Sequence, residues 1–252
     1  MNKIPKIVVV IPTYNEITQT KRMIEVVLEQ VFPKIKDHEM MLLYVDSHSP
    51  DGTWKLVQDE SKKYPKQLFL LDEGGKYGLG KAYEHGFRYA IDKLQADAVM
   101  EMDSDFQHDP FDIPRFIKEF DGNADYVIGS RYIRGGSIPN EWSFGRKFLS
   151  IVGNLVYRVG LLMWDIHDFT TGFRLARVKG FLGDIDFNVT FSKKSFTYKT
   201  WLLYEMKKRG AKVVEIPIMF NLRSDGDSKM TTNNIFDSLW LILDIWQTRL
   251  SS

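Results

Sequence analysis

The chain has 252 residues, of which 44% are hydrophobic and 13% aromatic, enough for a substantial buried core. Its 34 basic and 33 acidic residues nearly cancel, which excludes a global electrostatic attraction to nucleic acid. The sequence contains no cysteine, so a disulfide framework and thiolate zinc sites are excluded as well.

Continuous apolar runs alternate with helical segments in the first half of the chain. The runs Ile7 to Ile11 and Met40 to Val45 predict strands that are buried on both faces of a sheet. Thr13 and Asn15 offer N-caps for a helix that extends to about Phe32. The other elements predicted here are a turn at 49–52 followed by a helix, a strand at 68–71, a helix at 81–94 and a strand at 97–102.

The second half of the chain is less regular. It predicts strands at 126–129 and 213–220, and a helix at 146–163. Strands separated by helices at these intervals indicate an α/β fold with a mostly parallel central sheet. Ligands of such sheets bind beyond the carboxyl ends of the strands. The stretches after Ile11, Val45 and Met102 are therefore expected on one rim.

An acidic segment, Asp103 to His108, follows the strand predicted at 97–102. In an extended conformation Asp103, Asp105 and Gln107 would point the same way, and three oxygen ligands suit Mg²⁺ or Mn²⁺. The alternative is a pair of solvated loop acids, which a bare D-x-D pattern favours because it is short and common. The position at the end of a buried strand favours a functional site.

Several segments together resemble the family 2 glycosyltransferases with a GT-A fold, and most closely their dolichol-phosphate (polyprenol-phosphate) mannose synthase branch. The segments are IPTYNE (11–16), VDSHSPDGT (45–53), GKYGLGKAYEHGF (75–87), DSDFQHDP (103–110), IGSRYIRGG (128–136), TTGFR (170–174) and EIPIMFNLRSDGDSKM (215–230). They occur in family order over nearly the whole chain. No internal repeat or low-complexity linker divides the sequence, which predicts one domain over 1–252, with a donor half at about 1–110, an acceptor half at about 111–230 and a C-terminal amphipathic helix at about 231–250.

The activity that the resemblance implies is inverting, metal-dependent transfer of a sugar, mannose or another hexose, from a nucleotide sugar to a polyprenyl or dolichyl phosphate. Mg²⁺ or Mn²⁺ is the implied cofactor. GDP-mannose is the favoured donor. A UDP-sugar remains open, because Ser47 and His48 stand where family members commonly carry a second Asp and then Asn or Gly.

The resemblance also implies roles for matching residues. The pocket for the nucleoside is formed by Pro12, Tyr14, Glu16, Tyr44 and Asp46. The ribose and diphosphate contacts are Asp103, Ser104 and Asp105, and the metal ligands are Asp103, Asp105 and Gln107. The cationic clamp on the phosphates consists of Arg131, Arg223 and Lys229, with Asp105 and Arg131 as the catalytic residues. The chemistry of Arg, which binds phosphate with two parallel hydrogen bonds, agrees with this clamp.

The acceptor side rests on weaker patterns. A phosphate monoester is ionised near neutral pH and needs no protein base, which agrees with a lipid phosphate acceptor. Arg134 and Arg174 are candidates to hold that phosphate. For Arg174, a structural hydrogen bond to backbone is an equally good interpretation.

Two apolar segments with basic residues, 146–164 and 235–250, predict either interfacial helices or internal core helices. No apolar run approaches the roughly 20 residues that span a bilayer. We therefore expect a cytoplasmic protein, peripheral to the cytoplasmic face of a membrane, which contacts the membrane surface directly or through an anchoring partner protein.

Three other functions are compatible with parts of the sequence. Gly75 to Lys81 resembles a P-loop, but Ala82 stands where the loop needs a Ser or Thr for Mg²⁺. A family 2 glycosyltransferase acting on a non-lipid glycan would use the same donor chemistry. An inactive scaffold that binds nucleotide sugars is the alternative from another class, and the intact Asp103, Asp105 and Gln107 set speaks against it.

Overall fold

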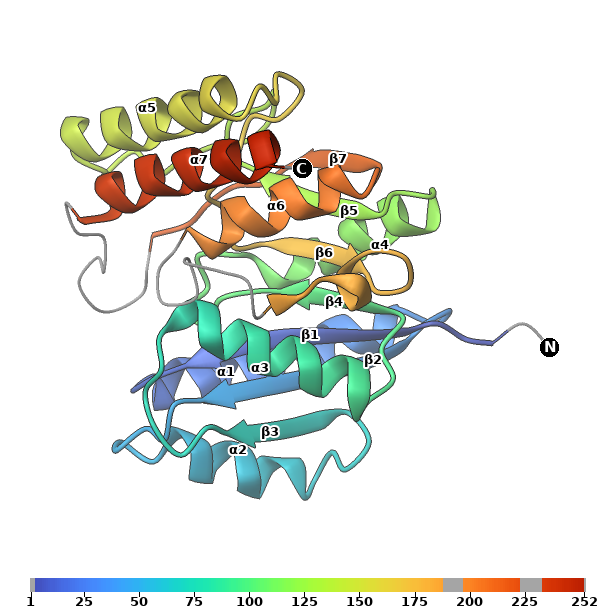
Figure 1. The fold of residues 1–252 in the computed structure, drawn as a ribbon. Coiled ribbons are helices and arrows are strands. Elements are labelled where there is room, and N and C mark those ends of the chain that lie inside the picture. Colours follow the sequence, from blue (N-terminus) through green and yellow to red (C-terminus); the bar gives the residue numbers. More distant parts are fainter. Residues whose placement is uncertain (1–2, 188–196, 223–232, 252) are drawn as a thin grey trace.

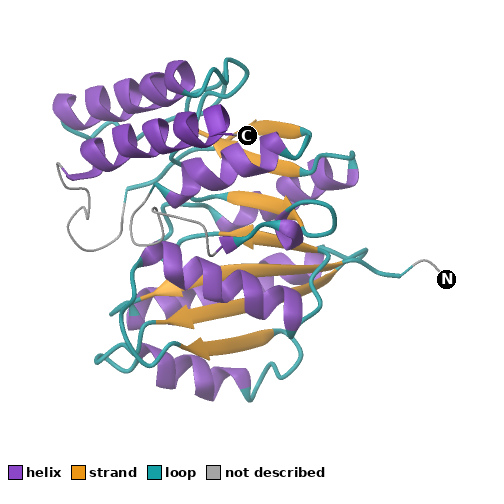
Figure 2. Ribbon diagram, in the orientation of Figure 1, coloured by secondary structure: helices purple, strands orange, loops and turns teal. Residues whose placement is uncertain are grey.

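A computed structural model describes residues 3–187, 197–222 and 233–251 of the chain. Within these ranges a seven-stranded sheet runs through the molecule with helices on both faces (Figures 1 and 2). The strand order is β3-β2-β1-β4-β6-β5-β7. The strands are β1 (Lys6–Thr13), β2 (Glu39–Asp46), β3 (Leu68–Asp72), β4 (Ala98–Glu101), β5 (Tyr126–Ser130), β6 (Arg174–Arg177) and β7 (Val213–Pro217).

The helices connect the strands and cover the sheet. They are α1 (Ile17–Val26), α2 (Thr53–Ser61), α3 (Leu79–Asp92), α4 (Ile113–Asp121), α5 (Phe144–Gly160), α6 (Tyr198–Lys208) and α7 (Asn233–Ser251). Short 3-10 turns lie at 110–112 and 182–184. Neither α4 nor α6 was predicted, whereas α3 and α5 each begin two residues before their predicted starts.

The sheet is mostly parallel, as predicted. The exception is β6, which runs antiparallel to both β4 and β5. This strand was not predicted, because its four residues are an apolar pair, Leu175 and Ala176, between two arginines. It separates the parallel group β3-β2-β1-β4 from the parallel pair β5-β7.

Strand β1 shows why both faces of the sheet are buried. Val8 and Val10 belong to a core shared with α3 and α6, whereas Ile7, Val9 and Ile11 belong to a core shared with α1 and α4. All five side chains are fully buried. Successive side chains of a strand point to opposite faces, so an uninterrupted apolar run serves both cores. Burial on both faces therefore holds the carboxyl end of β1 in place, and with it the start of the loop that follows.

The start of α1 differs from the prediction. Asn15 has a φ of 56°, in the left-handed region, and Glu16 precedes the helix without a side-chain cap bond. The predicted caps at Thr13 and Asn15 are therefore wrong. The helical run continues beyond α1 as a π-turn at 27–31 and a 3-10 turn at 32–34, so its predicted end near Phe32 is confirmed.

The C-terminal helix α7 lies along α5 (Figure 1). Its Leu241 and Ile245 are buried in the core. The two helices approach closely at Gly160, where an added methyl carbon would lie 2.8 Å from Cδ1 of Ile242. Trp246 Nε1 donates to the Gly160 carbonyl at 2.7 Å. One face of α7 is thus docked on the protein itself.

Candidate functional site

Two polar loops meet at the carboxyl ends of β1 and β2, where Thr13 and Asp46 are register partners. The Thr13 hydroxyl donates to Asp46 Oδ2 at 2.9 Å, and Asp46 also accepts from the N–H and hydroxyl of Ser49 at 2.7 and 2.8 Å. The Ser49 hydroxyl oxygen accepts from the Asn15 N–H at 3.0 Å. Asp46 is fully buried, and its hydrogen bonds to Thr13 and Ser49 connect the loop after β1 with the loop after β2.

The other residues implied for the nucleoside surround this junction. Pro12, Tyr14 and Glu16 are half-buried, and Tyr44 is completely buried. Lys76 Nζ lies 3.9 Å from the centroid of the Tyr14 ring. Burial raises the pKa of Tyr44, whose hydroxyl lies beside that of Ser104. Ser104 Oγ is also 3.3 Å from Thr20 Oγ1. The stretches after β1, β2 and β4 thus meet on one rim, as predicted.

The acidic segment after β4 is a turn, and the extended conformation predicted for it is wrong. Phe106 has a φ of 61°, and Asp105 Oδ1 accepts the Gln107 N–H at 3.0 Å. Ser104 and Asp105 are 1% and 3% exposed, whereas Asp103 and Gln107 are half-buried. A left-handed residue inside the segment breaks the period of two, so the predicted alternation of faces does not occur.

Gln107 is engaged with the chain that follows β7. Its Nε2 donates to the Asn221 carbonyl at 3.3 Å, and its own carbonyl accepts from the Asn221 N–H at 3.0 Å. Asn221 Nδ2 in turn donates to the Phe106 carbonyl at 3.3 Å. Arg223 and Lys229, which the resemblance assigns to the cationic clamp, lie outside the described residues.

Asp103 is held by two aromatic neighbours. Its N–H donates to His108 Nδ1 at 3.2 Å, and the Tyr83 hydroxyl lies 3.5 Å from its Oδ1. Burial lowers the pKa of His108, so the imidazole is neutral, and because Nδ1 accepts, the proton belongs on Nε2. Nε2 is buried without a hydrogen-bonding partner among the described residues. His108 was not assigned a role from the sequence.

The donor set of this turn fits a shared metal site. Among the described residues, no group of three or more His, Asp or Glu side chains could hold a metal ion. Mg²⁺ and Mn²⁺ are, however, often bound by one or two carboxylates, with phosphate and water oxygens completing the coordination. Asp103, with 32% of its side chain exposed, and Asp105 suit such a site. Gln107 would bind a cation through its amide oxygen Oε1, whereas its contact with Asn221 is made by Nε2.

Arg131, expected in the phosphate clamp, forms a buried ion pair directly after β5. Its Nε and Nη2 donate to the two carboxylate oxygens of Asp168, each at 2.7 Å, and Nη2 also reaches the Thr170 hydroxyl at 2.7 Å. Burial alone would raise the pKa of Asp168, but the charge and hydrogen bonds of Arg131 outweigh burial, and the pKa is lowered. The guanidinium is thereby fixed in orientation.

A second carboxylate, Glu215 on β7, supports this pair. It accepts from the Asp168 N–H at 2.9 Å, and from the N–H and Nδ1 of His167 at 2.9 and 2.8 Å. Sequence reasoning missed both Asp168 and Glu215. Asp168 stands two residues before the TTGFR segment and Glu215 opens the EIPIMF segment, so their places in these motifs were the available signal.

The two acceptor candidates lie in different environments. Arg134 is exposed on the loop after β5. Arg174 is fully buried on β6, where its guanidinium donates to the Tyr126 hydroxyl at 3.1 Å, the Phe169 carbonyl at 2.7 Å and the Lys199 carbonyl. These contacts correspond to the structural role that the sequence left open for Arg174.

Buried charges lie directly beneath the acidic turn, and the sequence did not indicate them. Tyr198 donates to Glu101 Oε2 at 2.7 Å, and Lys199 is only 3% exposed. Burial raises the pKa of Glu101 and lowers the pKa of Lys199. Glu101 lies inside a predicted strand and Lys199 in an unpredicted helix, so neither had a sequence signal.

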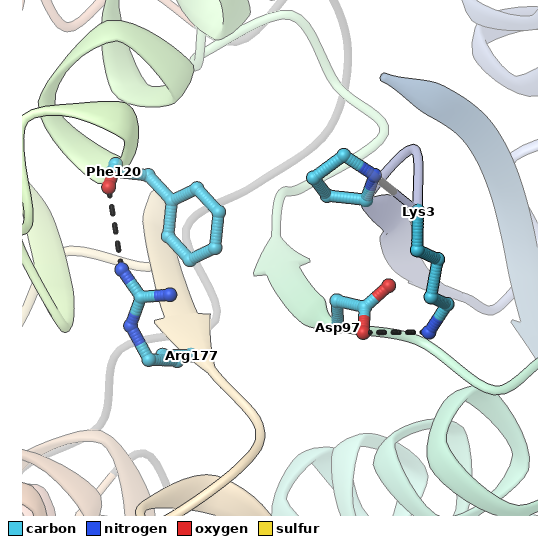
Figure 3. A pocket seen from close by; sticks show the side chains of 5 residues that line it. Lys3, Asp97, Phe120 and Arg177 are labelled. Carbon is cyan, nitrogen blue, oxygen red and sulfur yellow. Dashed lines mark hydrogen bonds and ion pairs between the residues drawn. The ribbon is translucent and has the colours of Figure 1, made fainter. Parts of the chain in front are cut away.

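A cavity of about 280 Å³ lies near the amino ends of the inner strands β1 and β4, at the end of these strands opposite the rim (Figure 3). Lys3 pairs with Asp97 at 2.9 Å, and Arg177 donates to the Phe120 carbonyl at 3.3 Å. In parallel α/β sheets ligands bind at the carboxyl ends of the strands. This cavity therefore does not belong to the rim site.

Helices α5 and α7 carry a broad apolar surface. Its exposed side chains are Phe144, Phe148, Leu149, Ile151, Leu155, Val159, Leu162 and Trp164 on α5 and the turn after it, and Leu239, Trp240, Leu243 and Trp246 on α7. On α5 many of them recur every three or four residues, which places them on one side of the helix. Across the described ranges, every helix is too short or too polar to cross a membrane.

Comparison with known proteins assigns this architecture. The family model for Glycosyl transferase family 2 matches residues 8–182. The chain is 34% identical to a polyprenol monophosphomannose synthase from Mycolicibacterium smegmatis over 96% of the chain and 86% of that enzyme. It is also 34% identical to a dolichol-phosphate mannosyltransferase from Pyrococcus furiosus, over 93% of the chain and 62% of that enzyme.

Solved structures share the fold at lower identity. A glucosyl-3-phosphoglycerate synthase from Mycobacterium tuberculosis, in complex with Mn²⁺, UDP and glucosyl-3-phosphoglycerate, aligns with a TM-score of 0.65 at 14% identity, covering 97% of this chain and 80% of that one. A mannosyltransferase from Pyrobaculum calidifontis in complex with GDP-mannose and Mn²⁺ aligns with a TM-score of 0.59 at 17% sequence identity. This alignment covers 89% of this chain and 59% of that one. The predicted GT-A fold is confirmed, and the chain belongs to glycosyl transferase family 2.

Proposed function

We propose that this glycosyltransferase transfers mannose from a nucleotide sugar to a polyprenyl phosphate, with inversion at the anomeric carbon. The observation that carries the proposal is the 34% identity over 96% of the chain with a polyprenol monophosphomannose synthase. An undecaprenyl-phosphate mannosyltransferase from Micrococcus luteus, also 34% identical over 90% of the chain, supports the same substrate class.

The donor is proposed to bind on the rim formed by the loops after β1, β2 and β4. The nucleoside lies near Tyr14 and Asp46, and the diphosphate near Asp103 and Asp105. GDP-mannose is the proposed donor. Ser47 and His48, in the loop after β2, lie near the proposed position of the nucleotide base. The Ser47 hydroxyl donates to Glu73 at 2.9 Å and His48 forms a hydrogen bond with Asp72 at 2.9 Å, so both side chains already have partners within the protein.

A divalent cation, Mg²⁺ or Mn²⁺, would be held by Asp103, Asp105 and Gln107, where it supplies positive charge to the departing nucleoside diphosphate. The protein adds charge of its own. Asp168 fixes the guanidinium of Arg131, which is close enough to interact electrostatically with Asp103. Arg223 and Lys229 are proposed, by family resemblance, to contact the same phosphates. Asp105 and Arg131 are the proposed catalytic residues.

The acceptor phosphate is proposed to attack from the side of the sugar opposite the diphosphate, which inverts the anomeric centre. The lipid phosphate is already ionised near neutral pH, so the attack needs no protein base. Exposed Arg134 is proposed to hold this phosphate. Arg174 is left out of this role in our proposal because it is 0% exposed within the sheet, where its guanidinium donates to Tyr126, Phe169 and Lys199.

The apolar surface of α5 and α7 is proposed to lie on a membrane and to bring the site to its lipid acceptor, on the cytoplasmic face. Lys147 and Arg158 flank the exposed apolar side chains of α5, which suits anionic lipid headgroups. A membrane-anchoring partner protein is the alternative occupant. Flotation with anionic liposomes distinguishes the two, because a partner requirement would leave the purified protein in the soluble fraction.

Transfer assays test the proposed function. The protein is incubated with Mn²⁺ and either GDP-mannose or a UDP-hexose, each with a polyprenyl phosphate or a soluble glycan. We expect labelled polyprenyl phosphate with GDP-mannose. Transfer to the glycan alone would establish the other acceptor class, and binding of donor without any turnover would identify an inactive scaffold.

A further inference from the structure

Lys199, in the first turn of α6, is a buried lysine that the proposed reaction does not use. Its side chain is 3% exposed, although lysine is almost never fully buried unless it is paired. The charged groups around it are Asp103 and Glu101, which attract it, and Arg174 and Arg131, which repel it. Asp103 makes the larger of the two attractive contributions.

Gly172 places the ammonium group beside Asp103. A methyl carbon added at position 172 would lie 2.2 Å from Lys199 Nζ and 3.4 Å from Asp103 Oδ2. Lys199 Nζ and Asp103 Oδ2 therefore both lie next to the space that a larger residue at position 172 would fill. The first of these distances is far below any van der Waals contact, so glycine is what allows the ammonium to reach this position.

The surroundings make Asp103 the carboxylate that Lys199 balances. Glu101 receives the Tyr198 hydroxyl at 2.7 Å, and Arg174 faces it across the β4-β6 pair. Asp103 Oδ2 and the Lys199 ammonium both lie against the space at Gly172, and Asp103 makes a larger attractive contribution to Lys199 than Glu101 does. A partly buried carboxylate is stabilised by a nearby cation, and Lys199 supplies one.

We propose that Lys199 is the internal counter-ion of Asp103, a positioning residue that fixes this carboxylate and weakens divalent-cation binding until the diphosphate arrives. The inference rests on the proposed function for the identity of the ligands, but the pairing itself does not. A unit positive charge beside Asp103 opposes a second cation at the same carboxylate. The negative diphosphate offsets this repulsion, so cation and nucleotide bind cooperatively.

A double-mutant cycle on the ligand-free protein tests the pairing. Lys199→Gln should lower the melting temperature by about 5 °C or more, because it leaves Asp103 without its cation. Adding Asp103→Asn should recover part of that loss. Lys208→Gln, at an exposed lysine of the same helix, is the matched control and should change nothing. Losses that simply add in the double variant would overturn the pairing.

A variant that keeps the lysine covers the case in which Lys199→Gln does not fold. Gly172→Ala should destabilise the wild-type protein, since its methyl displaces the ammonium, and should cost less when position 199 carries the shorter Gln. If Gly172→Ala folds but Lys199→Gln does not, Asp103→Asn is added to Gly172→Ala. We expect this second substitution to restore the melting temperature. Gly153→Ala on α5, with no atom within 4 Å of the added methyl, is the control. Equal losses in all backgrounds would contradict the proposed contact.

Mn²⁺ binding, followed by electron paramagnetic resonance of the free ion, tests the second part. Without nucleotide, Lys199→Gln should bind Mn²⁺ at least about threefold more tightly than wild type. Equal or weaker binding, or no binding by either protein, would overturn the effect on the cation. None of these measurements uses a sugar donor or a lipid. The pairing can thus be confirmed even if the protein has no transferase activity, and it can be refuted even if the protein is an active transferase.

Discussion

The buried pair of Arg131 and Asp168 is a direct stability test of the site. Asp168 accepts six hydrogen bonds, from three N–H groups of Arg131, from the backbone N–H groups of Thr170 and Thr171 and from the Thr170 hydroxyl, at 2.7 to 3.4 Å. Asp168→Asn removes the charge and turns an amide NH₂ toward these donors. Removing one partner of a buried ion pair costs about 3–5 kcal/mol. For a chain of this size that corresponds to a melting temperature lower by roughly 10 °C.

The pH dependence of this loss has a defined direction. The pKa of Asp168 is lowered in the folded protein, so its contribution is fully present above the unfolded-state pKa of about 3.9 and disappears as the pH falls through the lower folded value. The difference in melting temperature between wild type and Asp168→Asn should therefore be constant from about pH 7 to 5 and become smaller below about pH 4.

Differential scanning calorimetry at several pH values measures both effects. Replacing both partners, as in Arg131→Met with Asp168→Leu, should be less destabilising than either single change, because no unpaired charge remains. A loss below about 2 °C for Asp168→Asn at pH 7, or a gap that is unchanged at low pH, would refute the reasoning.

Three further predictions concern the rim, the apolar surface and β6. Asp105→Ala should abolish mannosyl transfer with the circular dichroism spectrum unchanged, and activity that survives both this change and a chelator would contradict the metal role. Phe148→Asp with Leu155→Asp should release the protein from anionic liposomes in flotation, whereas Phe111→Asp, an exposed apolar residue outside α5 and α7, should not; equal loss in both would contradict the membrane surface. Arg174→Met should lower the free energy of unfolding by about 3 kcal/mol in urea titration, because it removes the buried hydrogen bonds of the guanidinium to Tyr126, Phe169 and Lys199, and a neutral effect would count against the structural role.

The sheet was largely predictable, for a physical reason. Strands β1 and β2 are buried on both faces, so their sequences are uninterrupted apolar runs. Strand β6 was missed because Arg174 is buried through its own hydrogen bonds, which a hydrophobic pattern does not indicate. Helix α6 was missed for a similar reason, since Lys199 and Thr200 are buried polar residues on its inner side.

The site was predictable in position but not in geometry. The rule that ligands bind beyond the carboxyl ends of parallel strands brought the stretches after β1, β2 and β4 together. The conformation of the acidic turn depends on the left-handed Phe106, which its sequence does not specify. The partners of Arg131 and Asp103 could not be identified either. Asp168 and Lys199 lie 37 and 96 positions further along the chain and become neighbours only through the order of β4, β6 and β5.

The central claim is transfer of mannose to a lipid phosphate, and product analysis tests it most directly. Purified protein, GDP-[¹³C]mannose, Mn²⁺ and a short polyprenyl phosphate are incubated together, and the lipid fraction is analysed by mass spectrometry and by NMR of the anomeric carbon. We predict a mannosyl phosphopolyprenol with the anomeric configuration inverted relative to the donor. An unmodified lipid, while the same protein glycosylates a soluble glycan, would contradict the account.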